Sequence, residues 1–132
     1  MSLSEEERRI IVQLELERAK RTFAEVETLK AAGMWNGVCN RLYYAVFHAI
    51  SALLIHDGHQ VNTHHGSHAV FGLHYIKTGV LPEDFGRLYN QLQTMREESD
   101  YNCAFEADQE ELENRIEPAR KMIETIEKMV NN

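Results

Sequence analysis

One stretch of the sequence, residues 38–53, decides the fold; it reads VCNRLYYAVFHAISAL. Its apolar residues cover most of the circumference of a helix, which is the pattern of a helix buried on nearly all sides. We therefore predict a central helix that is capped by Asn36 and runs to about His56, with Gly58 beyond its end. Four polar residues at spacings of three, four and three share one stripe of this helix: Arg41, Tyr44, His48 and Ser51. Because polar groups on a buried helix need partners, this stripe is the first candidate for a functional site.

Helical periodicity also dominates the sequence on both sides of this stretch. Capping signals, glycines and prolines place further helices at about residues 4–32, 63–78, 82–101 and 108–132, and the last of these contains Pro118, which should kink it. No stretch alternates in the manner of a strand. We predict an all-α fold, an up-and-down antiparallel bundle of four long helices plus one short helix, in a single domain over residues 1–132.

The net charge of −7 argues at first against a nucleic-acid partner, but it is unevenly distributed. Residues 97–132 hold 11 of the 21 acidic residues and only 4 of the 14 basic ones. Residues 33–96 hold 4 basic and 3 acidic residues, together with all seven histidines. The charge therefore leaves RNA binding open and predicts weak, local, salt-sensitive contact without a broad basic groove.

Other features predict a cytoplasmic protein with no membrane contact. The first residues are acidic, unlike those of a signal peptide, and the longest apolar stretch, about 14 residues, is shorter than the roughly 20 that a membrane span needs. Cys39 and Cys103 stand alone, so neither a disulfide framework nor a zinc knuckle is indicated.

Arg41 and His48 allow two interpretations. They lie two turns apart, about 10 Å along the helix axis, and could meet only through a substrate or across a symmetric partner. In a structural interpretation, Arg41 pairs with a carboxylate of a neighbouring helix and His48 bonds a backbone carbonyl. In a functional interpretation, Arg41 holds a phosphate while His48 moves a proton, as in metal-free RNA cleavage.

A second polar group ends the fourth predicted helix. Asp100 is poorly placed there, because the helix dipole disfavours an anion at the C-terminus, so we expect it to have a tertiary partner, with Arg41 as one candidate. The alternative is a purely structural ion pair that locks the second and fourth helices. Arg96 and Tyr101 flank Asp100.

Six histidines are concentrated between residues 56 and 74. His64 and His68 lie one turn apart and could share a metal ion, but no E-x-x-H frame and no cysteine accompany them. We therefore predict a pH-sensitive loop, with no metal and no cofactor.

Several linked segments resemble the HEPN (higher eukaryotes and prokaryotes nucleotide-binding) domain family, in particular its small stand-alone bacterial and archaeal branch. The resemblance covers about residues 10–130 and includes NRLYYAVFHA (40–49), THHG (63–66), FGLHYIKTG (71–79), LPEDFGRL (81–88) and REESDY (96–101). It implies a compact helical bundle, a homodimer, and a minimal nucleotidyltransferase as partner in a toxin–antitoxin-like pair. Some members are metal-independent RNases in which four to six residues separate an arginine from the histidine that follows it. Arg41 and His48 meet this spacing at its upper limit, but Leu42 stands where a polar residue often follows the arginine, and Arg96 lacks such a histidine.

Three hypotheses follow. The first is a HEPN-type module that pairs with a nucleotidyltransferase-like protein and contacts nucleotide or RNA through Arg41, Tyr44, His48, Arg96 and the histidine-rich loop. Further candidate contacts are Ser51, His64, Asp100 and Tyr101, and Tyr101 is also a candidate for nucleotide transfer. The second is a metal-independent endoribonuclease toxin with Arg41 and His48 as catalytic residues. The third is a structural or metal-responsive bundle that uses His64, His68 and His74.

Overall fold

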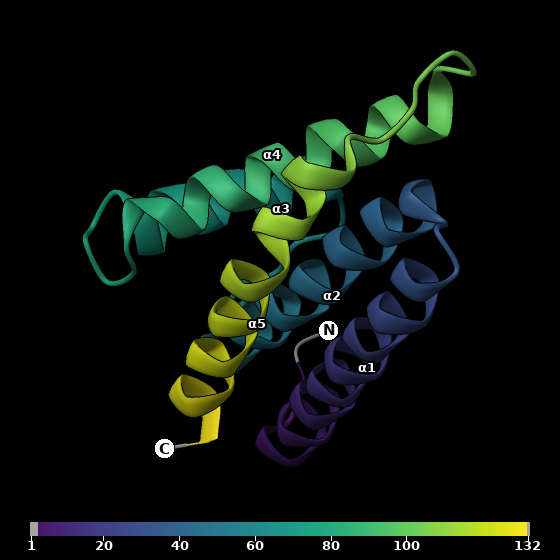
Figure 1. The fold of residues 1–132 in the computed structure, drawn as a ribbon. Helices are drawn as coiled ribbons and strands as arrows, with labels where there is room; N and C mark the ends of the chain where they lie inside the picture. The colour runs from purple at the N-terminus through teal and green to yellow at the C-terminus, as the bar shows by residue number, and fades with distance from the viewer. Residues whose placement is uncertain (1–2, 132) are drawn as a thin grey trace.

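A computed structural model describes residues 3–131, and all regular structure within them is helical. The helices are α1 (Glu5–Ala31), α2 (Trp35–His56), α3 (His64–Phe71), α4 (Glu83–Tyr101) and α5 (Gln109–Asn131) (Figure 1). This confirms the predicted all-α fold of four long helices and one short one. One feature was not predicted: the short helix continues into a π-helical turn at Gly72–Ile76.

The central position of α2 follows from its composition. Its side chains pack against α1, α4 and α5, and the residues buried around it come from every side of the helix: Val38, Cys39, Leu42, Tyr43, Ala45, Val46, Ala49, Ile50, Ala52, Leu53 and Leu54. By length and composition α2 could cross a membrane, but 61% of its most apolar segment is buried inside the fold, as in the core helix of a bundle.

The other helices pack on α2 in different directions. Figure 1 shows α1 antiparallel to α2, with α4 crossing the other long helices at a steep angle. Pro118 lies inside α5, which changes direction partway along its length, as expected where a proline removes a backbone hydrogen bond. The crossing brings α3 and α4 close to the middle of α2, where the candidate site lies.

Most of the predicted helix ends are confirmed. Ser4 and Glu7 form the capping box of α1, and the hydroxyl of Thr63 accepts a hydrogen bond from the backbone of Gly66 at 2.9 Å to begin α3. Gly33 follows α1 with φ of 72°, the left-handed conformation that a glycine adopts without strain.

The predicted cap of α2 is wrong. The helix begins two residues earlier than this cap predicts, directly after Met34, and Asn36 lies inside its first turn. The Asn36 side chain instead accepts a hydrogen bond from the backbone of Ala107 at 3.0 Å. The asparagine that the local sequence predicts as a cap therefore makes a long-range contact instead. This contact links the start of α2 to the loop before α5.

Candidate functional site

The site is built on a cluster of aromatic rings in the middle of α2. The centroids of the Tyr43 and Tyr44 rings lie 5.1 Å apart, edge to face, and the Phe47 ring lies 6.0 Å from Tyr43. Tyr89 of α4 stacks on the other side of Tyr43 at 5.9 Å. Tyr43 is wholly buried, whereas Tyr44 and Phe47 are partly exposed. The cluster thus has a buried side at Tyr43 and a solvent-accessible side at Tyr44 and Phe47.

Arg96 of α4 lies over this cluster. Its Cζ atom is 4.9 Å from the Tyr43 ring centroid and 5.6 Å from that of Tyr44, distances typical of cation–π contacts. The residue is only 8% exposed. Within residues 3–131, its buried Nε atom has no hydrogen-bond partner.

Asp100 neutralises Arg96 and does not reach Arg41. Its Oδ2 atom accepts a hydrogen bond from Nη1 of Arg96 at 2.9 Å, one helical turn away. The expected tertiary pairing of Asp100 with Arg41 is therefore wrong. The reason is local, because an arginine four residues earlier on the same helix face reaches the carboxylate without any contribution from a neighbouring helix.

Arg41 also lies near Tyr44, with its Cζ atom 5.7 Å from the ring centroid. Its Nη1 atom is 3.4 Å from a carboxylate oxygen of Glu25 in α1, and Nε and Nη2 donate to the side-chain oxygen of Asn40. The side chain keeps 31% exposure. Two guanidinium groups thus flank one partly exposed tyrosine ring, and only that of Arg41 is open to solvent.

His48 is held by a carboxylate that sequence reasoning missed. Its Nδ1 atom lies 2.8 Å from Oε2 of Glu15 in α1, so the predicted backbone carbonyl is replaced by a side chain of another helix. A carboxylate on Nδ1 fixes the ring and leaves Nε2 for other contacts, as in many acid–base sites. The signal that could have found Glu15 is its place directly before the buried Leu16 on the apolar stripe of α1.

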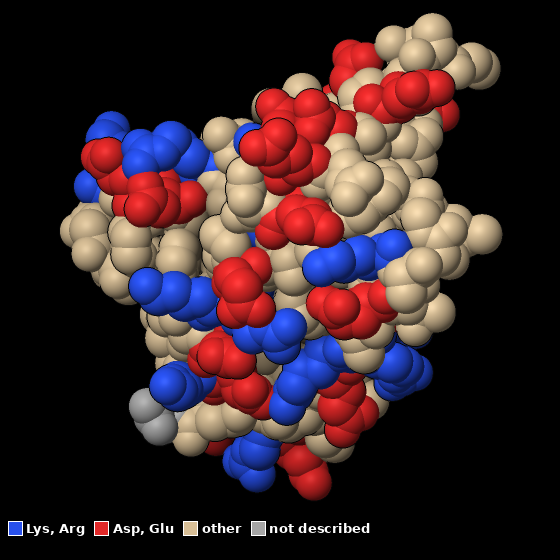
Figure 2. Space-filling view, viewed as in Figure 1, with Lys and Arg blue, Asp and Glu red and all other residues tan. Residues whose placement is uncertain are grey.

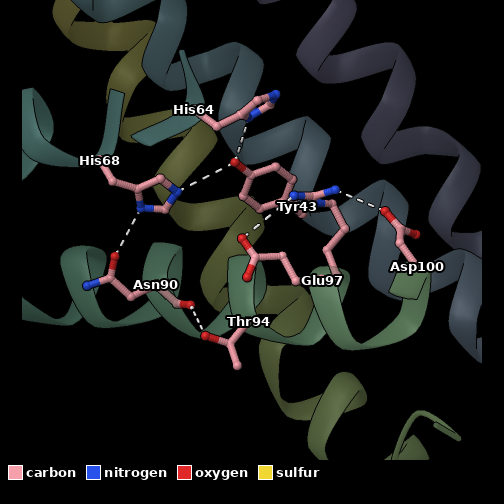
Figure 3. Close-up of polar contacts among 8 residues, drawn as sticks. Tyr43, His64, His68, Asn90, Thr94, Glu97 and Asp100 are labelled. Carbon is pink, nitrogen blue, oxygen red and sulfur yellow. Dashed lines mark hydrogen bonds and ion pairs between the residues drawn. The ribbon is translucent and has the colours of Figure 1, made fainter. Parts of the chain in front are cut away.

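Two of the histidines meet at the buried Tyr43 (Figure 3). The Tyr43 hydroxyl lies 2.9 Å from Nδ1 of His64 and 3.5 Å from Nε2 of His68, and Nδ1 of His68 is 3.0 Å from the side-chain oxygen of Asn90. Burial, reinforced by the positive charge of Arg96, lowers the pKa of His64. Burial also lowers the pKa of His68, against the opposing effect of its bond to Asn90. Both rings are therefore neutral at neutral pH.

The remaining predicted residues lie elsewhere. Ser51 lines a cavity beyond His48, and Tyr101, the last residue of α4, is 80% exposed and away from the cluster. The His74 ring lies 4.7 Å from that of His59, so the trio of His64, His68 and His74 is not brought together. In the described part of the chain, no three His, Cys, Asp or Glu side chains are grouped as metal ligands.

The surface charge follows the uneven sequence distribution. Figure 2 shows acidic side chains gathered over the end of α4 and the start of α5, where residues 97–117 are rich in Asp and Glu. Basic and acidic side chains alternate over α1 and the rest of α5 on this face. The face in view therefore has no continuous basic surface, in agreement with the expected absence of a broad groove for nucleic acid.

The helices form a small all-helical domain. Several polar side chains of α2, α3 and α4 lie around one aromatic cluster. The family model described as "HEPN domain" matches residues 12–129, so the chain belongs to the HEPN-domain family. It is 29% identical over 126 residues to a "UPF0332 protein" of Thermotoga maritima, with 96% of each chain covered.

Two proteins of Methanocaldococcus jannaschii, each named "Putative toxin", are also similar. One is 27% identical over 117 residues, which cover 89% of this chain and 87% of that protein. The other is 28% identical over 98 residues, which cover 74% of this chain and 67% of that protein. These relatives agree with the predicted small, stand-alone branch of the family.

Proposed function

We propose that this protein is the toxin-like HEPN component of a two-protein system, that its partner is a minimal nucleotidyltransferase, and that it contacts nucleotide or RNA through the face formed by α2, α3 and α4. The family and the names of the M. jannaschii relatives support the toxin-like class. We further propose that it acts in the cytoplasm as a homodimer, with a mass about twice the 15.3 kDa of one chain.

The proximity of two arginines to the partly exposed Tyr44 ring carries the proposal. The ring centroid is 5.7 Å from Cζ of Arg41 and 5.6 Å from Cζ of Arg96. A partly exposed aromatic ring offers a stacking surface for a base, and a neighbouring exposed guanidinium suits a phosphate. Arg96 is buried and bonds Asp100 at 2.9 Å, whereas Arg41 is more exposed and its contact with Glu25 is longer, at 3.4 Å, so Arg41 is the arginine that we assign to the phosphate.

Binding of a fluorescent single-stranded RNA tests this assignment. We expect Arg41→Ala to weaken binding and to reduce its salt dependence, because one phosphate contact is lost. Arg87→Ala removes an exposed arginine at the start of α4 and should leave binding unchanged. Absence of RNA binding by the wild-type protein, or an equal loss in both variants, would contradict the proposal.

Co-expression with a minimal nucleotidyltransferase encoded beside this protein tests the partner. A complex that survives size-exclusion chromatography with light-scattering detection would support the pairing. The free chain in the same experiment should elute with the mass of a dimer. Separate elution of the two proteins would contradict the pairing, and a monomer would contradict the homodimer.

The pair formed by Glu15 and His48 favours a second function, a metal-independent endoribonuclease. In this mechanism, the ribose 2′-hydroxyl attacks the adjacent phosphorus, the 5′-oxygen leaves, and the products are a 2′,3′-cyclic phosphate and a 5′-hydroxyl. Arg41 would stabilise the charge on the phosphorane. His48, oriented by Glu15, would transfer the proton of the 2′-hydroxyl to the leaving 5′-oxygen.

RNA cleavage in the presence of EDTA tests the enzyme. Cleavage by the wild-type protein, and by neither Arg41→Ala nor His48→Ala, would establish it. His65→Ala, at an exposed position of α3, serves as the matched control and should cleave normally. If none of the folded proteins cleaves RNA, the enzyme is rejected and the binding function remains.

A further inference from the structure

A cavity of about 260 Å³ lies between α1, α2 and the start of α3, beyond the His48 end of the polar stripe. Its wall includes Glu15, Phe47, Ser51, Leu54, Asn62 and His64. Because Glu15 also bonds His48, the cavity and the His48 side chain share one wall. The cavity therefore adjoins the candidate site, but neither Tyr44 nor the two arginines beside it line the cavity.

We propose that this cavity is a subsite for a neutral nucleobase, with adenine as the preferred base. The proposal rests on the proposed function, contact with nucleotide or RNA, and adds which part of the ligand is recognised and where. The size supports a single ring system, because cavities for whole drug-sized ligands begin at about 300 Å³. A peptide or a dinucleotide would not fit inside.

The walls suit the faces of a base. Leu54, Ile55 and Val61 supply aliphatic surface. The rings of Phe47 and His64, which both line the cavity, lie with their centroids 4.3 Å apart and their planes inclined by 30°, so they stack on each other and offer a ligand only their outer faces and edges. Proteins recognise unpaired bases by stacking them on such surfaces.

The charge of the cavity disfavours a phosphate. Glu15 supplies the one carboxylate of the wall, and its Oε2 atom is engaged by His48. No lysine or arginine contributes to the lining; its two histidines are His59 and His64, and burial lowers the pKa of His64. The phosphate of a bound nucleotide therefore belongs outside the cavity, toward the half-exposed Arg41.

Free hydrogen-bonding groups favour adenine. Among residues 3–131, no hydrogen bond joins the side chain of Ser51 or Asn62 to another protein group. A carboxamide offers a donor and an acceptor side by side, which match N7 and the N6 amino group of adenine. Cytosine N3 and N4 would match the same amide, so the preference for adenine comes from the larger stacking surface of a purine. Asn62 is exposed at the end of the loop before α3, so its amide can turn toward a ligand without disturbing the core.

Titration of the folded protein, followed by amide chemical shifts in NMR, tests the subsite with three probes: adenosine, cytidine and ribose 5-phosphate. We expect adenosine to shift the signals of Ser51, Asn62 and His64 and to bind more tightly than cytidine. Ribose 5-phosphate should leave these signals unchanged. Equal shifts with ribose 5-phosphate, or no response to adenosine, would overturn the proposal.

Three variants give the test a control. Asn62→Ala should weaken adenosine binding by about fivefold or more, the effect of losing a paired hydrogen-bond contact. Ser51→Leu fills the cavity and should abolish binding, with circular dichroism used to verify the fold. Asn114→Ala removes an exposed asparagine of α5 and should have no effect. Equal affinity of Asn62→Ala and the wild-type protein would reject the role of Asn62 and the adenine preference.

RNA binding separates the subsite from the proposed function. If Arg41→Ala loses RNA binding while adenosine never binds, the subsite fails and the proposed function stands. If the wild-type protein binds neither RNA nor adenosine, both fail. Adenosine binding that depends on Asn62, without RNA binding, supports the subsite for a mononucleotide and rejects contact with RNA.

Discussion

The hydroxyl of Tyr43 lies 2.9 Å from Nδ1 of His64, and this contact joins the middle of α2 to the first turn of α3. Burial raises the pKa of Tyr43 to about 12, so the hydroxyl is protonated at every physiological pH. It has one proton to donate and two histidines within reach. The placement of α3 on α2 therefore depends on a small polar network inside an aromatic cluster.

Removing this hydroxyl should loosen α3 without unfolding the protein. We expect Tyr43→Phe to lower the free energy of unfolding by about 1–2 kcal/mol, because it leaves partly buried nitrogens of His64 and His68 without a partner. Urea denaturation followed by circular dichroism measures the loss. Tyr101→Phe alters an 80% exposed ring and should change the stability by no more than about 0.5 kcal/mol. Equal stability of Tyr43→Phe and the wild-type protein would show that the hydroxyl has no structural role.

The same network predicts the tautomer of His64. The side-chain oxygen of Asn90 accepts from Nδ1 of His68, so Nε2 of the neutral His68 must accept from Tyr43. The Tyr43 oxygen then accepts from Nδ1 of His64, which leaves Nε2 of His64 with a free lone pair. Long-range proton–nitrogen NMR spectra should show His64 protonated at Nδ1 near pH 7.5. A proton at Nε2 would mean that the hydrogen bonds run in the opposite direction.

The helices could be predicted from the sequence because their signals are local. The capping box of Ser4 and Glu7 and the glycine after α1 depend only on neighbouring residues, and both are confirmed. Partners at a distance could not be predicted in this way. Asn36 bonds Ala107, 71 residues further along the chain, and the carboxylate of Glu15 bonds His48 from another helix.

The same difference between local signals and long-range contacts applies to the candidate site. The stripe of Arg41, Tyr44, His48 and Ser51 follows from helical spacing, but its convergence with His64 and Arg96 depends on how α3 and α4 cross α2. Crossing angles are set by the packing of whole helix faces, which a single sequence does not reveal. The sequence does not distinguish Tyr43 as a site residue for another reason: a tyrosine in an apolar run is expected to be a core residue.

Stability should fall with decreasing pH because His64 and His68 are held neutral. Their folded-state pKa values lie below the usual 6.5, so at lower pH the unfolded chain takes up protons that the folded chain excludes. The stabilisation is complete above about pH 6.5 and is lost as the pH falls through the lowered pKa values. Tyr43 and Asn90 bond these rings, and Glu97, whose charge partly opposes the shift of His68, faces them from α4.

Urea denaturation at pH 7.5 and pH 5.5 measures this dependence. His68→Gln should reduce the difference in unfolding free energy between the two pH values, because one of the two groups no longer titrates. His65→Gln alters an exposed neighbour on α3 and should keep the wild-type difference. A wild-type protein that is equally stable at both pH values would contradict the neutral, buried state of the two rings.

The two arginines beside Tyr44 should differ sharply in their effect on stability. Arg96 is 8% exposed and lies over two tyrosine rings, and its removal would leave Asp100 without a partner. Loss of a buried pair costs about 3–5 kcal/mol, and the partial exposure of Asp100 reduces the expected loss for Arg96→Met to about 2–3 kcal/mol. Arg41→Met should cost no more than about 0.5 kcal/mol, because Arg41 is more exposed and its ion pair with Glu25 is long.

Arg96→Lys separates charge from shape at this position. A lysine keeps the positive charge but cannot lie flat on two rings while donating to Asp100, so we expect it to recover only part of the lost stability. Urea denaturation of the three variants, with RNA binding measured on the same samples, assigns each arginine its role. We assign Arg96 to the stability of the α2–α4 contact and the more exposed Arg41 to a ligand. Loss of stability in Arg41→Met equal to that in Arg96→Met would contradict this division.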